Sequence, residues 1–249
     1  MRSLVLLLFF CLITLAGYAQ QEQFEAANQR YNEGAYTEAA QQYEALIEVG
    51  FHSPELHYNL GNSYYKQRAY GRAVLHYERA LLLRPGDADI RHNLQEVQSR
   101  LKDDIEELPA FFLAEWWGGL RQAASVGAWS FLSILMIWLA VVGGYFWLNG
   151  KERQIRKYGF LAGLAFFLLS LLSFSLAFSQ HQLNQDSGQA VVLEASIPLR
   201  SAPDAESTAL LDLHEGTKVD ILDQIGEWYK INLANGDQGW LPFSAVEKI

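Results

Sequence analysis

The strongest feature of the hydrophobic pattern is a pair of long uncharged apolar runs, residues 126–148 and 158–178. Each run reaches the roughly 20 apolar residues that a helix needs to cross ~30 Å of hydrocarbon. We therefore predict two membrane-spanning helices joined by a loop at 149–157. The alternative is a buried hairpin inside a soluble domain, which would need a larger globular body than this chain can wrap around it.

Positive charge dominates the loop, with Glu152 opposed by Lys151, Arg153, Arg156 and Lys157. The positive-inside tendency then places the loop in the cytoplasm and both flanking segments outside.

Residues 20–108, ahead of these runs, show helical periodicity and repeat themselves at an interval of 34 residues. Six positions of the first copy recur in the second, and the pair Asn59-Leu60 recurs as Asn93-Leu94. The six are Asn28, Ala35, Tyr36, Ala39, Tyr43 and Glu44, which recur as Asn62, Ala69, Tyr70, Ala73, Tyr77 and Glu78. A period of 34 residues is typical of antiparallel helix pairs that bury their apolar faces by stacking on one another.

The second copy resembles the tetratricopeptide repeat family closely. Seven of its residues stand at the family's leucine, glycine, tyrosine, alanine, aromatic, alanine and closing proline positions: Leu60, Gly61, Tyr64, Ala73, Tyr77, Ala80 and Pro85. The first copy departs from the pattern, with Ala27 and Arg30 at the glycine and tyrosine positions. The third copy is only a first helix, about 87–102. An array this short is near the lower limit of stability, so we expect it to lean on the membrane or on a partner.

The resemblance implies that the first helices form a concave surface that binds peptides. The partner-binding candidates are Asn28, Tyr31, Tyr58, Asn62, Tyr65, Lys66 and Arg100, and Phe24, Asn32, His92 and Glu96 lie on the same surface. Amides, tyrosines and cations together can hydrogen-bond a peptide and accept a carboxylate. The family's carboxylate clamp needs a lysine where this chain has Phe24, which argues against capture of a C-terminal carboxylate. The alternative is a solvated face without a ligand.

Residues 109–125 form a short amphipathic segment between the repeats and the first apolar run. Pro109 ends the preceding helix, and an apolar stripe then includes Trp116 and Trp117. Tryptophans beside a span favour a helix that lies in the headgroup layer of the membrane. The alternative is that this stripe packs under the repeat domain.

After a polar linker at 179–188, residues 189–249 change to short alternating runs separated by turn residues. We predict strands at 190–193, 210–213, 219–222, 228–233 and 239–241, with a two-residue hairpin turn at Asn235-Gly236. Such a segment suits a small SH3-like barrel. It resembles the bacterial SH3 family in the stretches 198–203, 213–217, 227–231 and 239–241. Trp228 and Trp240 are that family's usual tryptophans. They either fill and rim the barrel core or offer a stacking surface to cell-wall glycan or peptide.

Residues 1–19 read as a secretion signal, with Arg2, an apolar run and a small-x-small site that ends at Ala19. Cleavage there removes Cys11, the only cysteine, so the mature chain would have neither disulfides nor thiolate ligands. Both flanking domains are acidic. Residues 21–108 hold 9 basic and 15 acidic residues, and 186–249 hold 4 and 11. This balance argues against nucleic-acid partners, which need a basic surface.

The sequence has no phosphate loop, serine elbow or zinc helix motif. The six histidines are scattered, although His57 and His92 fall on adjacent first helices and are expected to approach each other. The acidic run 103–107 is expected to be solvated. We therefore predict no catalytic residue, no cofactor and no metal.

These observations predict a multidomain membrane protein with all-α tetratricopeptide repeats, a two-helix transmembrane hairpin and an all-β SH3-like barrel. The order of modules resembles the BatE-type membrane proteins of the Bacteroides aerotolerance operon. That resemblance implies a non-catalytic inner-membrane scaffold with both soluble domains in the periplasm. It also implies protein partners with membrane-anchored von Willebrand A domains. The alternative is a wall-binding or wall-sensing protein that contacts peptidoglycan through the SH3 domain.

Overall fold

The computed structural model describes residues 20–103, 105, 111–185 and 188–249. The predicted signal peptide, residues 1–19, lies outside the described residues. The chain divides into two compact units, one of which holds the helical repeat together with the C-terminal strands, while the other holds the long apolar helices. Each unit is described by itself below.

The repeat region consists of consecutive antiparallel helices. They are helix 20–32, α2 (Tyr36–Glu48), α3 (Pro54–Lys66), α4 (Tyr70–Leu83) and α5 (Ala88–Gln98). Ser53 caps α3 by accepting a hydrogen bond from the Leu56 backbone N–H (3.1 Å), with Pro54 at the first helical position. Asp87 caps α5 in the same manner. The sequence predicted the first helix of a third repeat at about 87–102. α5 is that helix, but it ends at Gln98.

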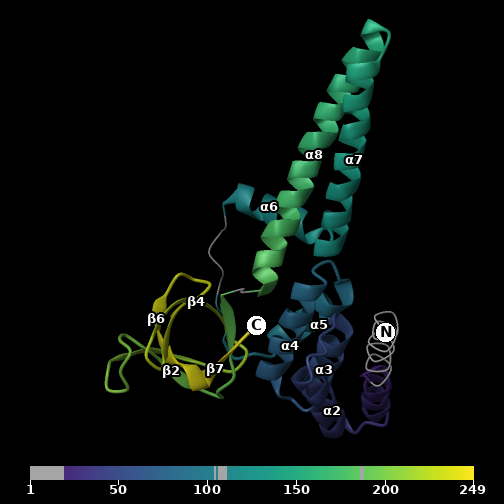
Figure 1. The fold of residues 1–249 in the computed structure, drawn as a ribbon. Coiled ribbons are helices and arrows are strands. Elements are labelled where there is room, and N and C mark those ends of the chain that lie inside the picture. The colour runs from purple at the N-terminus through teal and green to yellow at the C-terminus, as the bar shows by residue number, and fades with distance from the viewer. Residues whose placement is uncertain (1–19, 104, 106–110, 186–187) are drawn as a thin grey trace, which may run out of the picture. The chain divides into compact units, whose positions relative to one another are not determined.

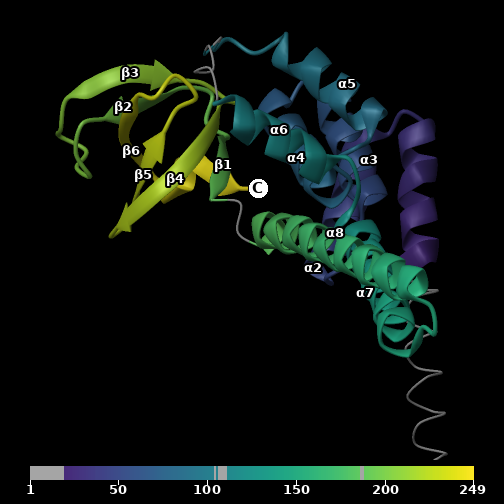
Figure 2. The same cartoon turned by 90° about the horizontal axis from the view of Figure 1, so that it is seen from above.

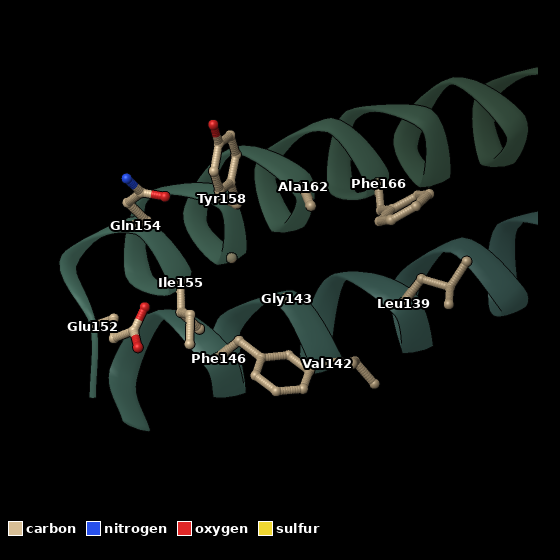
Figure 3. Close-up of a pocket in the computed structure, with 11 residues that line it drawn as sticks. Leu139, Val142, Gly143, Phe146, Glu152, Gln154, Ile155, Tyr158, Ala162 and Phe166 are labelled. Atoms are coloured by element: carbon tan, nitrogen blue, oxygen red, sulfur yellow. The ribbon is translucent and has the colours of Figure 1, made fainter. Parts of the chain in front are cut away.

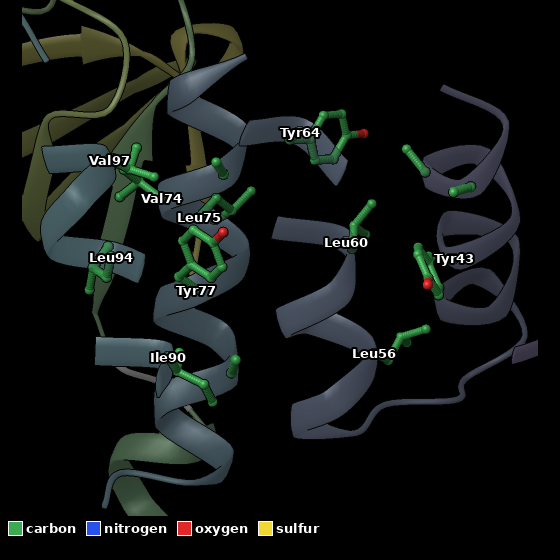
Figure 4. Close-up of a cluster of buried hydrophobic side chains, with 14 of the residues drawn as sticks. Tyr43, Leu56, Leu60, Tyr64, Val74, Leu75, Tyr77, Ile90, Leu94 and Val97 are labelled. Atoms are coloured by element: carbon green, nitrogen blue, oxygen red, sulfur yellow. The ribbon is translucent and has the colours of Figure 1, made fainter. Parts of the chain in front are cut away.

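Aromatic and aliphatic side chains fill the core between these helices. Figure 4 shows Leu56 and Leu60 of α3 facing Tyr43 of α2, with Tyr77 of α4 in the same cluster. A Cβ built on Gly61 would lie 2.8 Å from the Tyr77 ring, so only glycine allows α3 and α4 to approach this closely. This contact gives the steric reason for a glycine at the position where the tetratricopeptide pattern has one.

The second unit contains α6 (Phe112–Gln122), α7 (Val126–Asn149) and α8 (Arg153–Gln185). α7 and α8 lie side by side along their length (Figures 1 and 2). Both are long and apolar enough to cross a membrane, with mean hydropathies of 2.1 and 2.2. α8 is longer at both ends than the apolar run predicts. It takes in residues 153–157 of the predicted loop and 179–185 of the predicted linker, because Arg, Lys and Gln are good helix formers.

Small residues bring the two long helices into contact. A Cβ on Gly143 would lie 2.7 Å from Gly163 Cα, and one on Gly159 would lie 2.7 Å from the Trp147 backbone nitrogen. The hairpin therefore closes at Gly143, Gly159 and Gly163, which the sequence places shortly before and shortly after the predicted loop. Gly144 stands at a similar position, but a Cβ built on it would meet no atom within 4 Å.

The C-terminal residues form one antiparallel sheet that curls into a small barrel (Figure 1). Its strand order is β3-β2-β6-β5-β4-β1-β7. The strands are β1 (Gln189–Val192), β2 (Ile197–Arg200), β3 (Ala209–Leu213), β4 (Lys218–Ile225), β5 (Trp228–Asn232), β6 (Gln238–Pro242) and β7 (Val246–Lys248), with a 3-10 turn, η1 (Phe243–Ala245), before β7. β2 and β7 were not predicted as strands, because Pro198 interrupts the alternation in β2 and the three residues 246–248 are too few to show one.

The predicted two-residue turn at Asn235-Gly236 is wrong. A type I′ turn needs positive φ at both residues, but only Gly236 has it (φ 89°). Gly236 N–H donates to the Leu233 carbonyl (2.9 Å), and Leu233 N–H donates to the Asp237 carbonyl (2.8 Å). The chain therefore turns one residue earlier, and Gly236 follows the turn.

The barrel packs on α4 of the repeat region within the first unit. Val191 of β1 is fully buried and belongs to the core of the helical repeat, not to that of the barrel. A Cβ on Gly71 would lie 3.1 Å from Glu215 Cβ, so α4 touches the turn between β3 and β4. Two ion pairs flank the contact, Lys218 with Glu78 (2.9 Å) and Arg79 with Glu247 (3.0 Å). The repeat array therefore leans on the chain's own barrel, which the sequence did not predict. Support from the membrane or from a partner stays a prediction.

Asp103 fastens the chain after α5 to the barrel. Its Oδ2 accepts hydrogen bonds from the His214 backbone N–H and from Thr217 Oγ1, both at 2.7 Å, and its Oδ1 lies 2.6 Å from His214 Nδ1. Burial raises the pKa of Asp103, but the bonds from Thr217 and His214 outweigh it and leave the pKa below its ordinary value. The prediction of a solvated acidic run is therefore wrong for Asp103, whereas residues 104, 106 and 107 lie outside the described residues.

Candidate partner-binding groove

A cavity of about 260 Å³ opens on the first helices of the repeats. It is lined by Tyr31, Tyr58, Asn62, Tyr65, Lys66, Tyr77, Asn93 and Glu96. These side chains come from helix 20–32, α3, α4 and α5, so stacking of successive repeats creates the cavity. Phenols, amides and one charge of each sign dominate its wall, which makes it a polar site and not an apolar pocket.

A hydrogen-bonded pair of asparagines and a tyrosine joins the first two repeats. Tyr43 Oη donates to Asn28 Oδ1 (2.7 Å), and Asn59 Nδ2 donates to the same oxygen (2.9 Å). Asn28 therefore uses its side-chain carbonyl to tie α2 and α3 to the helix before them. It does not line the cavity, although it was predicted as a partner-binding residue.

The same arrangement recurs 34 residues later, at the base of the cavity. Tyr77 Oη donates to Asn62 Oδ1 (2.6 Å), and Asn93 Nδ2 donates both to Asn62 Oδ1 (2.9 Å) and to Tyr58 Oη (3.0 Å). Burial raises the pKa of Tyr77, so its phenol stays a donor at any physiological pH. Because the Asn62 carbonyl already accepts two hydrogen bonds, its amide hydrogens are held as donors for a ligand.

The two cations predicted in the groove are not equivalent. Arg100 Nη2 lies 2.6 Å from Glu96 Oε1, and its guanidinium lies 5.4 Å from the centre of the Tyr65 ring. The hydrogen bond from Arg100 lowers the pKa of Glu96. Arg100 lies just beyond the end of α5 and is engaged by Glu96 of α5 and Tyr65 of α3, and it does not line the cavity. Lys66 does line it, and it forms no ion pair with any residue that the structure describes.

Five of the seven predicted partner-binding residues therefore meet in one cavity: Tyr31, Tyr58, Asn62, Tyr65 and Lys66. Tyr77 and Asn93 were not predicted to belong to it. The sequence did contain a signal for them, because Tyr77 and Asn93 are the 34-residue repeats of Tyr43 and Asn59. What the pattern alone did not reveal is that a tyrosine of a second helix reaches the floor of the groove.

A stack of imidazole rings lies in the core between α3 and α4. His57 and His76 are buried, their Nδ1 atoms are 3.2 Å apart, and the Tyr64 ring stacks on His76 with a centroid distance of 5.6 Å. His52 Nδ1 lies 3.4 Å from His57 Nε2. Burial, with the nearby charge of Arg79, lowers the pKa of His57 to about 4. The predicted approach of His57 to His92 is wrong, because His57 points into the core whereas His92 is exposed.

No cluster of three metal-ligating side chains is found among the described residues. The rings of His52, His57 and His76 are stacked in sequence, with neighbouring centroids 5.6 and 5.5 Å apart. We treat this cluster as part of the repeat core.

The two barrel tryptophans are half-buried and do not belong to the barrel core. Trp240 of β6 alternates with buried Gly239 and Leu241, so its side chain lies on the outer face of the sheet. Its cross-strand neighbours are Arg200 on β2 and Lys230 on β5. Trp240 therefore stands on the barrel surface between two basic positions.

Comparison with known families agrees with both modules. Residues 54–87 match the family model of the tetratricopeptide repeat, and residues 195–246 match that of the bacterial SH3 domain. The first match covers α3 and α4, whereas helix 20–32 and α2 add a further helix pair on the same pattern. No curated protein matches the chain. A repeat of a type that mediates protein–protein interaction thus stands beside a domain type associated with cell-wall binding.

Proposed function

We propose that this protein is a non-catalytic scaffold, anchored in the inner membrane by α7 and α8, that binds a protein partner through the repeat groove. The observation that carries the proposal is the polar cavity in which Lys66 has no carboxylate partner among the described residues. Lys66 is exposed at the rim of this cavity, where its ammonium group can pair with a ligand that brings a negative charge.

The groove chemistry favours an extended acidic segment of a partner protein. The Asn62 amide and the hydroxyls of Tyr31 and Tyr58 can donate to the ligand's backbone carbonyls, and Lys66 can pair with a carboxylate. Glu96 can accept from a backbone N–H, because Arg100 holds its carboxylate in place. Few contacts fit in so small a cavity, so the affinity should rest on Tyr65 and Lys66.

The membrane topology is part of the same proposal. The basic residues where α7 and α8 join are Lys151, Arg153, Arg156 and Lys157, the last three within the first turns of α8. They favour a cytoplasmic hairpin end, which leaves the repeats and the barrel in the periplasm. Single cysteines at exposed Gln41, Gln154 and Glu206 test it in spheroplasts with a membrane-impermeant thiol reagent. Labelling at 41 and 206 is expected. Labelling of Gln154→Cys alone would reverse the topology.

The arrangement of modules resembles BatE-type proteins of the Bacteroides aerotolerance operon, which suggests membrane-anchored von Willebrand A-domain proteins as partners. A role in an aerotolerance or envelope-stress complex follows from the same resemblance. Both are proposals for this chain.

Co-purification of partners from detergent-solubilised membranes tests the groove. Loss of the Lys66 charge should cost about 2 kcal/mol, near thirtyfold in affinity, so Lys66→Ala should release the partner. Trp240→Ala is the control, because it alters the barrel surface and leaves the groove intact. Deletion of the whole barrel is not a suitable control, since it removes Val191 from the repeat core. Retention of the partner by Lys66→Ala and its loss from Trp240→Ala would refute the groove proposal.

A second candidate function is binding to the cell wall through the barrel. It is favoured by Trp240, which lies on the outer face between Arg200 and Lys230, where an aromatic ring can stack on a sugar and the cations can meet peptide carboxylates. Sedimentation of the detergent-solubilised protein with purified sacculi tests it. Wall binding should be lost in Trp240→Ala and kept in Lys66→Ala.

A further inference from the structure

A second cavity that could hold a ligand lies where the two long helices join. It has a volume of about 460 Å³ and is lined by Trp147, Leu148, Arg153, Arg156, Lys157 and Phe160. The first two residues come from the end of α7 and the others from the start of α8. The Trp147 and Phe160 rings contact each other at 5.3 Å between centroids. One half of the cavity wall is therefore apolar and the other half is basic.

The three cations are gathered on one side of α8. Arg153, Arg156 and Lys157 are spaced i, i+3 and i+4, which places them on the same helical face. Like charges at this spacing destabilise a helix, and the helix dipole also disfavours cations in the first turn. Helix stability therefore does not explain this pattern, whereas a bound anion would relieve both effects.

No acidic side chain of the hairpin balances these charges. Glu152 is the only acidic residue between positions 126 and 185. It lines a separate, mainly apolar groove of about 450 Å³ with Phe146 and Ile155 (Figure 3). Among the described residues, none forms an ion pair with Arg153, Arg156 or Lys157. The basic cavity therefore keeps a charge of about +3 for a ligand.

The level of the cavity in the membrane indicates which anion would reach it. α7 has 24 residues, so at 1.5 Å per residue it is roughly 36 Å long. A hydrocarbon core is ~30 Å thick, so the ends of such a helix emerge among the lipid headgroups. Trp147 at that end has an aromatic ring of the kind that favours this layer. A lipid phosphate is the anion that occurs at this depth.

We propose that this cavity binds one anionic phospholipid. Its phosphate contacts Arg153, Arg156 and Lys157, and the first carbons of its acyl chains pack on Trp147, Leu148 and Phe160. A zwitterionic lipid brings its own cation into a site that already carries three, so it binds more weakly. The proposal rests on the membrane anchoring in the proposed function and is independent of the repeat groove.

Native mass spectrometry of the full chain in detergent tests the site, with phosphatidylglycerol and phosphatidylcholine as probes. We expect one phosphatidylglycerol per chain, retained in preference to phosphatidylcholine. Each neutralised cation should weaken binding about fivefold. The triple variant Arg153→Gln, Arg156→Gln, Lys157→Gln should therefore lose about a hundredfold and with it the preference for the anionic lipid.

Lys151→Gln is the matched control, because Lys151 belongs to the same segment and carries the same charge but does not line the cavity. It should change affinity by less than twofold. An equal loss for Lys151→Gln and Arg156→Gln would mean diffuse attraction to charge and would overturn the site. Glycerol 3-phosphate is the soluble arm, and binding of it as tight as that of phosphatidylglycerol would overturn the lipid assignment. Recovery of the chain without detergent would instead refute the membrane anchoring.

Discussion

The buried histidines of the repeat core predict that its stability falls as the pH drops below neutral. The His57 pKa is about 4 in the folded chain, against about 6.5 in an unfolded one. Between these values the unfolded state binds a proton that the folded state does not, so unfolding becomes easier as pH falls. The stabilisation is complete above pH 6.5 and is lost down to about pH 4, below which both states are protonated.

The size of the effect follows from the shift in pKa. A shift of about 2.5 units at about 1.4 kcal/mol per unit gives roughly 3 kcal/mol for His57 over the whole range, of which about 2 kcal/mol is lost by pH 5. His76, whose pKa is lowered by burial and by His57, acts in the same direction. The other groups facing the pair are His52, Arg79 and Arg72. A loss of this size is a large part of the 5–15 kcal/mol that stabilises an ordinary domain.

Hydrogen exchange of α3 and α4 peptides in the full-length protein, corrected for intrinsic exchange rates, measures this loss. Opening of the repeat core should be about thirtyfold more frequent at pH 5 than at pH 7. His57→Gln should flatten that dependence even if it lowers stability at neutral pH. His92→Gln is the control, because His92 is exposed and its replacement should leave the slope unchanged. Equal slopes for wild type and His57→Gln would refute the assignment to this buried ring.

Three further predictions concern the hairpin, the barrel contact and the floor of the groove. Gly143→Leu should separate α7 from α8 and expose the hairpin to protease, because its Cβ would lie 2.7 Å from Gly163 Cα, whereas Gly144→Leu should be tolerated in open space. Asp103→Ala should speed hydrogen exchange around Thr217 by an amount equivalent to about 2 kcal/mol, because the His214 and Thr217 donors lose their acceptor; unchanged exchange would remove Asp103 from the interface. Tyr77→Phe and Tyr43→Phe should each cost about 1 kcal/mol of repeat stability. Only Tyr77→Phe should also weaken partner binding in a pull-down, since only Tyr77 holds a groove amide.

The architecture of this chain could be predicted wherever local patterns decide it. The 34-residue recurrence sufficed for the helix pairs, and the glycines of the hairpin predicted its contact. The extent of α8 could not be read from hydropathy, because Arg153 and Gln185 are polar residues that nevertheless favour helix. Strands β2 and β7 were missed because Pro198 and the short run 246–248 give no alternation, and they form by pairing with distant strands.

The candidate site likewise contains some residues that the sequence predicted and others that it could not. Lys66 and the tyrosines of the first helices follow from repeat positions alone. The pairing of Arg100 with Glu96 and the orientation of Asn62 depend on how helices stack, which spacing does not specify. Asp103 could not be assigned from a run of acidic residues, because its partners, His214 and Thr217, lie more than 100 residues further along the chain.

Photo-crosslinking in living cells tests the central claim, that the repeat groove holds a protein partner. A benzophenone amino acid would replace His92, which is exposed on the same face of α5 as Glu96 of the cavity, and in a separate strain Trp240 on the barrel. The account predicts a protein adduct from position 92, identified by mass spectrometry, which disappears when Lys66→Ala is added. An adduct that forms from position 240 alone, or one at position 92 that persists in the Lys66→Ala background, would contradict it.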